Sequence, residues 1–89
     1  MSRFIVLHTC DKSRRLGLVD GYGKYHVACV TDGPMAAVGD NLHGSNPALG
    51  VHFLVTAQSG QTLSTNFESV RVSRDAMVAM ALPGPPVGA

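Results

Sequence analysis

Hydrophobic positions in this chain fall into short runs that are separated by glycine, proline and polar turn residues. Residues 3–8, 24–30 and 50–58 are rich in β-branched and aromatic side chains and have the length of strands. Residues 17–19, 35–38 and 68–73 are shorter runs of the same kind. In residues 24–30 a period of two places Tyr25, Val27 and Cys29 on one face and His26, Ala28 and Val30 on the other. These patterns predict a domain made of short strands.

The segments between these runs are predicted as turns and loops. Ten glycines and five prolines punctuate the chain, and residues 20–23 and 32–34 are strong turn signals. Residues 10–16 and 41–49 are expected to be loops, and residues 62–66 are polar and rich in serine and threonine. Residues 76–82 follow a possible helix cap at Ser73 or Asp75, so we expect either a short helical turn or a packed strand. Together the pattern predicts an all-β fold of short strands joined by Gly/Pro turns, with or without one short C-terminal helix.

The length of 89 residues allows one domain, 1–89, with no room for two cores. A net charge of +1 gives no basic face for nucleic acid, so no nucleic-acid partner is expected. No run is long enough for a membrane span or a signal peptide, so we expect synthesis in the cytoplasm. Cys10 and Cys29 are then expected to be thiols, and Cys29 is predicted to pack in the core. The charged fraction of 15% is low, which suggests that part of the surface meets a partner.

Four histidines and two cysteines are the candidates for metal chemistry. His8 and Cys10 are separated by one residue, so on a strand both side chains point the same way. His26 and Cys29 would face opposite sides of their strand and are not expected to share an ion. The chain contains neither a nucleophile elbow nor a complete dinucleotide-binding loop, and no pair of carboxylates stands out. We therefore expect neither an enzyme nor a small-molecule substrate.

Residues 33–44, GPMAAVGDNLHG, resemble the signature of the PAAR-repeat family of spike-tip proteins in phage tails and type VI secretion systems. Pro34, residues 36–40 and the following His43-Gly44 carry the resemblance. A second pass, from residue 58 through Arg71 to Asp75, is similar in outline. The sequence departs from the family pattern at Ala37, where the first arginine should stand, and no cysteine follows Asp75.

The resemblance implies a small cone-shaped fold whose narrow end is held by a metal with three histidines and one cysteine. In this sequence His8, His43 and His52 are similar in order to the family's histidines, and Cys10 is the available thiolate. The metal would be one zinc or iron ion per chain. The base of the cone would sit on a trimeric β-helical spike, and the tip would briefly contact a target cell membrane. The protein would leave the cytoplasm within a phage tail or a secretion apparatus; the sequence leaves these two open.

A second hypothesis is a small β-barrel adaptor of SH3-like or OB-like type that binds a protein or a peptide. It predicts a five- or six-stranded barrel with scattered histidines and no metal. The apolar run of residues 77–82 fits a docking base under the first hypothesis, or core packing under either.

Overall fold

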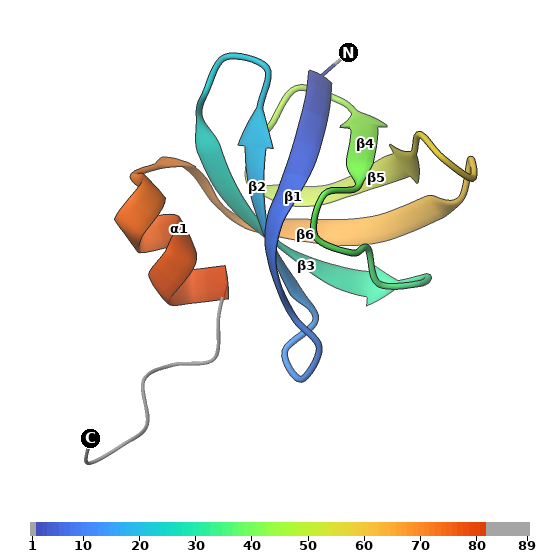
Figure 1. Ribbon diagram of the computed structural model, residues 1–89, viewed down its shortest axis with the longest axis horizontal. Helices are drawn as coiled ribbons and strands as arrows, with labels where there is room; N and C mark the ends of the chain where they lie inside the picture. The colour runs from blue at the N-terminus through green and yellow to red at the C-terminus, as the bar shows by residue number, and fades with distance from the viewer. Residues whose placement is uncertain (1, 82–89) are drawn as a thin grey trace.

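The computed structural model describes residues 2–81. Six strands and one helix follow one another along the chain (Figure 1). They are β1 (Ser2–Cys10), β2 (Arg15–Asp20), β3 (Tyr25–Asp32), β4 (Asn41–Gly44), β5 (Gly50–Thr56), β6 (Thr62–Val72) and α1 (Arg74–Ala81). The all-β fold class is confirmed, and the residues predicted as a short helical turn or a strand form α1.

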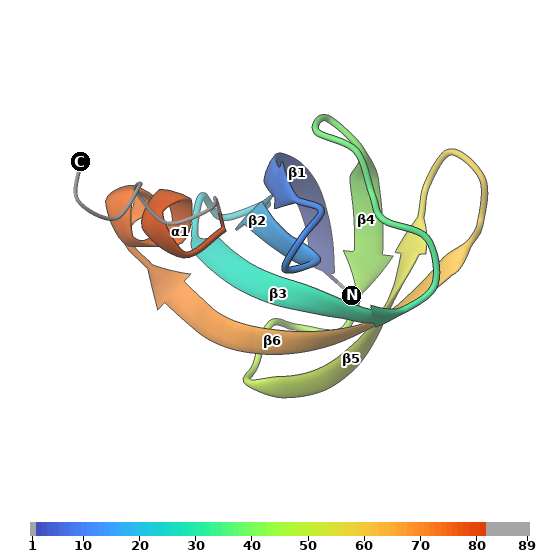
Figure 2. The same ribbon diagram turned by 90° about the horizontal axis from the view of Figure 1, so that it is seen from below.

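The strands form a closed antiparallel barrel in the order β1-β2-β3-β6-β5-β4. β1, β2 and β3 make one meander and β4, β5 and β6 make a second. The pairings of β3 with β6 and of β1 with β4 join the two meanders (Figure 2). Every pairing is between antiparallel strands, so tight turns suffice to connect neighbours. A six-stranded barrel is the architecture that the adaptor hypothesis predicts.

The barrel interior is filled by side chains that alternate along the strands. Phe4 and Phe67 are its largest members, and Ala28 and Val30 of β3 also point inside. The predicted division of β3 into two faces is therefore confirmed. The prediction that Cys29 packs in the core is wrong, because it lies on the outer face and is only half-buried.

Two local predictions around residue 40 are also wrong. Residues 35–38 form no strand, and residues 41–44, expected to be a loop, form β4. The Asp40 carboxylate accepts a hydrogen bond from the Ala37 amide at 2.9 Å, and Gly39 has a φ of 93°. These features bend residues 37–40 into a tight turn, which Val6 of β1 holds through two backbone hydrogen bonds. The turn therefore includes the end of the apolar run of residues 35–38, and strand β4 begins after the turn, at Asn41.

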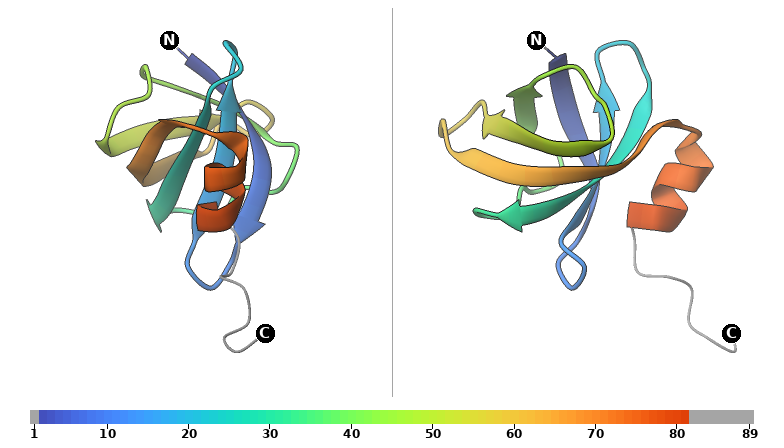
Figure 3. Two further views of the ribbon diagram at one scale, coloured as in Figure 1. Left: turned by 90° about the vertical axis from the view of Figure 1, so that its left-hand side faces the viewer. Right: turned by 180° about the vertical axis from the view of Figure 1, so that it is seen from behind.

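Helix α1 covers the outside of the barrel over β2 and β3 (Figure 3). The Ser73 hydroxyl accepts the Ala76 amide at 3.1 Å and caps the helix, as one of the two predicted caps would. Met77 and Ala81, four residues apart on one helix face, are fully buried with Val27. Gly17 has no side chain where Met77 Sδ and Ala81 Cβ lie, so the helix packs closely on β2. Core packing is thus the role of these two residues. Residues 82–89, which include Leu82 of the predicted apolar run, lie outside the described residues.

Candidate functional site

The four predicted metal ligands are distributed over three strands of the barrel, β1, β4 and β5. His8 and Cys10 lie near the end of β1, opposite Gly17 and Arg15 of β2. An irregularity between Val6 and His8 interrupts the alternation there. Cys10 is buried, and hydrogen bonds from the Ser13 hydroxyl and from the Ser13 and Lys12 amides lower the pKa of its thiol.

His43 and His52 face opposite sides of the barrel wall. His43 lies opposite Val55 in the pairing of β4 with β5, and Val55 points to solvent. His52 precedes buried Leu54 by two residues and therefore points inward. Its Nε2–H donates to the Ala48 carbonyl at 2.8 Å, and its ring meets Phe67 edge-on at 5.1 Å. Within residues 2–81, no three His, Cys, Asp or Glu side chains are grouped so that they could hold a metal ion. The metal centre that the family resemblance implies stays a prediction.

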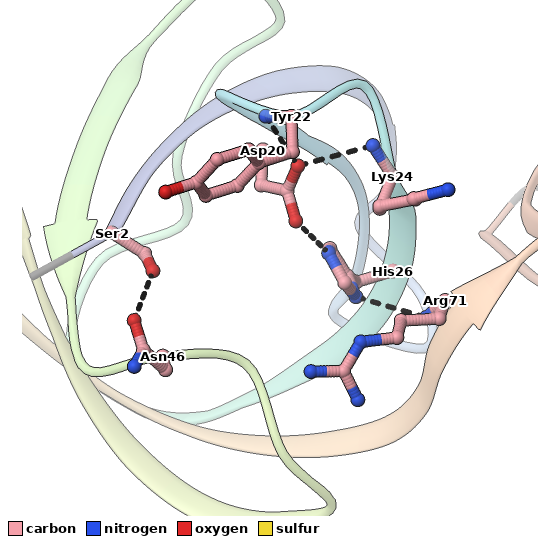
Figure 4. A network of polar contacts seen from close by, with 7 residues as sticks. All are labelled: Ser2, Asp20, Tyr22, Lys24, His26, Asn46 and Arg71. Atoms are coloured by element: carbon pink, nitrogen blue, oxygen red, sulfur yellow. Dashed lines mark hydrogen bonds and ion pairs between the residues drawn. The ribbon is translucent and has the colours of Figure 1, made fainter.

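A buried histidine and a carboxylate form the most connected polar group of the barrel (Figure 4). His26 on β3 is 0% exposed, and its Nε2–H donates to Asp20 Oδ2 at 2.8 Å. The other ring nitrogen, Nδ1, accepts the Arg71 amide at 3.1 Å, which defines the neutral Nε2–H tautomer. Asp20 Oδ1 accepts the amides of Tyr22 and Lys24 in the β2–β3 turn.

The charge of Asp20 is favoured by these contacts. Burial alone would raise the pKa of the carboxyl group, but the hydrogen bonds from His26 and from the Lys24 and Tyr22 amides outweigh it. The pKa of Asp20 therefore lies below its ordinary value. The alternation in residues 24–30 placed His26 on the same face as Ala28 and Val30, without deciding that this face points inward and without predicting the Asp20 partner. The available signal was Asp20 at the start of the turn, six residues before His26.

The His26–Asp20 pair has the hydrogen bond of an acid–base pair but lacks a free nitrogen. A general base needs a ring nitrogen within reach of a substrate proton. Both nitrogens of His26 are occupied, and the ring is fully buried. The pair instead fastens the β2–β3 turn to the end of β6, where Arg71 has a positive φ of 53°. Its role in this geometry is structural.

The outer face of β5 carries the most hydrophobic surface of the barrel. Val51, Phe53 and Val55 alternate along the strand and are 67%, 64% and 38% exposed. Leu49, just before the strand, continues the spacing and is 66% exposed. We call these four residues the β5 stripe. The inward positions of the same strand are His52, Leu54 and Thr56, so the more hydrophobic face of β5 points to solvent. An antiparallel strand with one solvated face ordinarily has the reverse arrangement.

Polar neighbours border the β5 stripe. On β6, the residues opposite Val51, Phe53 and Val55 are Asn66, Ser64 and Thr62. On the β4 side a hollow of about 720 Å³ is lined by His43, Gly44, Ser45, Phe53 and Val55. An apolar patch with a polar border is the usual composition of a protein-binding surface.

The segment that carries this surface has no formal charge. Residues 41–67, which include β4, β5 and most of β6, contain no Asp, Glu, Lys or Arg. All thirteen charged side chains, the seven basic and the six acidic ones, lie outside this segment. The low charge noted in the sequence is therefore concentrated on one side of the barrel. Interface centres are depleted of charge in the same way.

Comparisons with family models, curated proteins and solved structures give no match to this chain. Within residues 2–81, no helix combines the length and hydropathy required to cross a membrane. The function of the candidate site is therefore inferred from its geometry and chemistry alone. The β5 stripe and the adjoining hollow present apolar surface, and among the residues that line them His43 is the one with a side chain suited to acid–base or metal chemistry.

Proposed function

We propose that this protein is a small β-barrel adaptor that binds a protein partner on the β5 stripe. The observation that carries the proposal is the inverted orientation of β5, which exposes Val51, Phe53 and Val55 while His52 and Thr56 point inward. Water contact with these side chains is unfavourable, so selection for the monomer alone would favour polar residues there. A partner that covers the stripe removes this cost.

The exposed side chains can supply a moderate affinity. About two thirds of Val51 and of Phe53 is exposed, so their complete burial contributes on the order of 1–2 kcal/mol each. Association costs several kcal/mol in lost translational and rotational freedom. The stripe alone therefore supports a weak or transient complex, and the hollow beside His43 must add contacts for tighter binding.

Peptide selection tests this proposal without knowledge of the natural partner. A library of random peptides is selected on the wild-type protein and counter-selected on Phe53→Ser. We expect clones that bind the wild type and bind Phe53→Ser at least about tenfold more weakly, because roughly 1.4 kcal/mol corresponds to a factor of ten.

The matched control is Tyr22→Ser, which removes an aromatic side chain that is 90% exposed on the β2–β3 turn. The selected clones should bind it as they bind the wild type. Thermal denaturation of both variants checks that the barrel is intact. Failure to select any clone, or clones that ignore Phe53→Ser, would refute the adaptor function.

The spike-tip function implied by the family resemblance has a separate test. It requires a bound zinc or iron ion and a trimeric spike partner, neither of which the adaptor requires. Metal analysis of the purified protein decides whether the predicted ion is present. One tightly bound ion per chain would favour the spike tip over the adaptor.

A further inference from the structure

A row of outward-facing side chains crosses three strands and ends at the β5 stripe. Arg3 of β1 lies opposite His43 of β4, and His43 lies opposite Val55 of β5. Residues directly opposite each other on antiparallel strands share a face, and Val55 is partly exposed, so Arg3 and His43 also face outward. The exposure of Arg3 agrees with this, since the next residue on β1, Phe4, is fully buried. The outer surface that begins at the stripe therefore extends across β4 to Arg3.

Arg3 supplies the positive charge of this surface. The β4 and β5 positions of the row are neutral, because residues 41–67 contain no Asp, Glu, Lys or Arg. Neither of the two ion pairs found within residues 2–81 uses Arg3. Asp20 shares a hollow of about 230 Å³ with Arg3, but its side chain is 6% exposed and its oxygens accept hydrogen bonds from His26 and the β2–β3 turn. The guanidinium of Arg3 is therefore available to a ligand.

The opposite flank of the β5 stripe carries an acidic residue. On β6, Ser64 pairs with Phe53 on one side and with Asp32 of β3 on the other. The Asp32 carboxylate accepts the Gly33 amide at 3.0 Å, which holds it at the end of β3. A segment bound on the stripe thus has a positive charge on its β1 side and a negative charge on its β3 side. Complementary charges at the border of an interface select the partner and fix its register.

We propose that the partner of the β5 stripe is a peptide segment in which an acidic side chain lies about three residues from an apolar one. This partner chemistry rests on the proposed function of the stripe and extends it. The apolar side chain packs against Phe53 and Val55, and the carboxylate meets the Arg3 guanidinium, which can bind it through two N–H groups. Arg3 and Val55 are two strand separations apart, roughly 10 Å, and an extended chain spans this distance in about three residues.

The contact with Arg3 contributes to specificity more than to affinity. Arg3 is exposed at the border of the stripe, and an exposed ion pair changes a dissociation constant by at most about fivefold. Salt screens such a pair, because the screening length falls from about 10 Å at 0.1 M to about 3 Å at 1 M. Binding of an acidic peptide should therefore weaken as salt is added, whereas the apolar contact with the stripe should persist.

Peptides selected on the wild-type protein are the probe for this contact. Among clones that depend on Phe53, Asp or Glu should be enriched about three residues from an apolar residue. These clones should bind Arg3→Glu about five- to tenfold more weakly, because the change removes an attraction and adds a repulsion. Lys12→Glu is the matched control, since it makes the same change of charge at an exposed residue at the other end of β1. Binding to this control should stay within about twofold of the wild type.

Exchange of the charges tests the contact itself, which a purely structural role of Arg3 would not affect. A selected peptide whose acidic residue is replaced by lysine should bind the wild type more weakly than the original peptide does. The same lysine peptide should bind Arg3→Glu more tightly than the acidic peptide binds that variant. Both differences should disappear in 1 M NaCl. A selection repeated on Arg3→Glu should enrich lysine and arginine at the same spacing.

The possible outcomes separate the acidic partner from the adaptor function. If clones depend on Phe53 but show no enrichment of Asp or Glu, the adaptor function stands and the acidic partner is excluded. The same conclusion follows if the clones bind Arg3→Glu as tightly as Lys12→Glu. Enrichment of lysine and arginine on the wild type would mean that Asp32 sets the charge of the partner, and it would overturn the role of Arg3. If no clone depends on Phe53, both proposals fail.

Discussion

Replacing His26 with leucine should destabilise the barrel strongly. The imidazole is completely buried and uses both nitrogens, one on the Asp20 carboxylate and one on the Arg71 amide. Leucine cannot replace either hydrogen bond. The Arg71 amide would lose its acceptor, and Asp20, whose side chain is 6% exposed, would lose the donor to Oδ2.

The magnitude follows from these two contacts. A hydrogen bond to a charged group contributes about 1.5–3 kcal/mol, and a buried donor without an acceptor costs about 1–3 kcal/mol. The leucine side chain regains part of the lost stability through apolar contact with Phe4 and Phe67, which surround the His26 ring. We expect a net loss of about 3 kcal/mol, a large share of the roughly 5–15 kcal/mol that stabilises a small domain. For a chain of this size the melting temperature should fall by about 12–24 °C.

Chemical denaturation of the wild type and of His26→Leu gives the difference in the free energy of unfolding. His52→Leu is the matched control. The His52 ring makes one hydrogen bond, to the exposed Ala48 carbonyl, so this variant should lose about 0.5–1.5 kcal/mol of the free energy of unfolding. Nitrogen NMR of His26 should show the Nε2–H tautomer. If His26→Leu is no less stable than His52→Leu, the hydrogen bonds of His26 to Asp20 and Arg71 do not stabilise the barrel.

Three further predictions concern acid stability, the helix and the metal. The pKa of Asp20 is lower in the folded protein than in the unfolded chain, so its ionised carboxylate stabilises the fold above about pH 4, and this stabilisation is lost as pH falls through the folded pKa. The free energy of unfolding, measured from neutral to acid pH, should therefore decrease less steeply for Asp20→Asn than for the wild type. Met77→Ala empties a fully buried site between α1 and the barrel and should cost about 2–5 kcal/mol in chemical denaturation, whereas half-buried Met80→Ala should cost clearly less. His43→Ala should change the stability by less than about 0.5 kcal/mol if the outward-facing side chain holds no metal, and by many degrees of melting temperature if the predicted zinc or iron ion is bound there, with metal analysis of both proteins as the accompanying measurement.

Local strand patterns were predictable where one face is clearly apolar. The alternation in residues 24–30 correctly divided His26, Ala28 and Val30 from Tyr25, Val27 and Cys29, because period two is a property of any strand. The short C-terminal helix was one of two interpretations, and the cap at Ser73 supports the one that the structure has. The error at residues 35–44 arose because turn residues and apolar residues share that segment, and backbone bonds to Val6 decide where the turn ends.

The candidate site was less predictable from the sequence than the strands were, because it depends on the pairing of segments that are distant in the chain. Residues 50–58 were recognised as a strand from their apolar content, but both faces of that strand are hydrophobic enough to be buried. Which face points inward depends on the pairing with β6, which places Leu54 opposite Leu63 in the interior and leaves Phe53 outside. The predicted ligands His43 and His52 are separated by the pairing of β4 with β5. His43 lies opposite Val55 and shares its outward side, whereas His52, three residues before Val55 on the same strand, points inward.

The amino-acid sequence by itself determined that this protein is a small all-β domain, because hydrophobic periodicity and turn chemistry act over a few residues. It also determined that one long stretch, residues 41–67, carries no charge. Only the tertiary structure decided that the strands close into a barrel, that His26 meets Asp20 and Arg71, and that β5 turns its apolar face to solvent. These features depend on contacts between residues distant in the chain, and their geometry is set when the whole barrel packs.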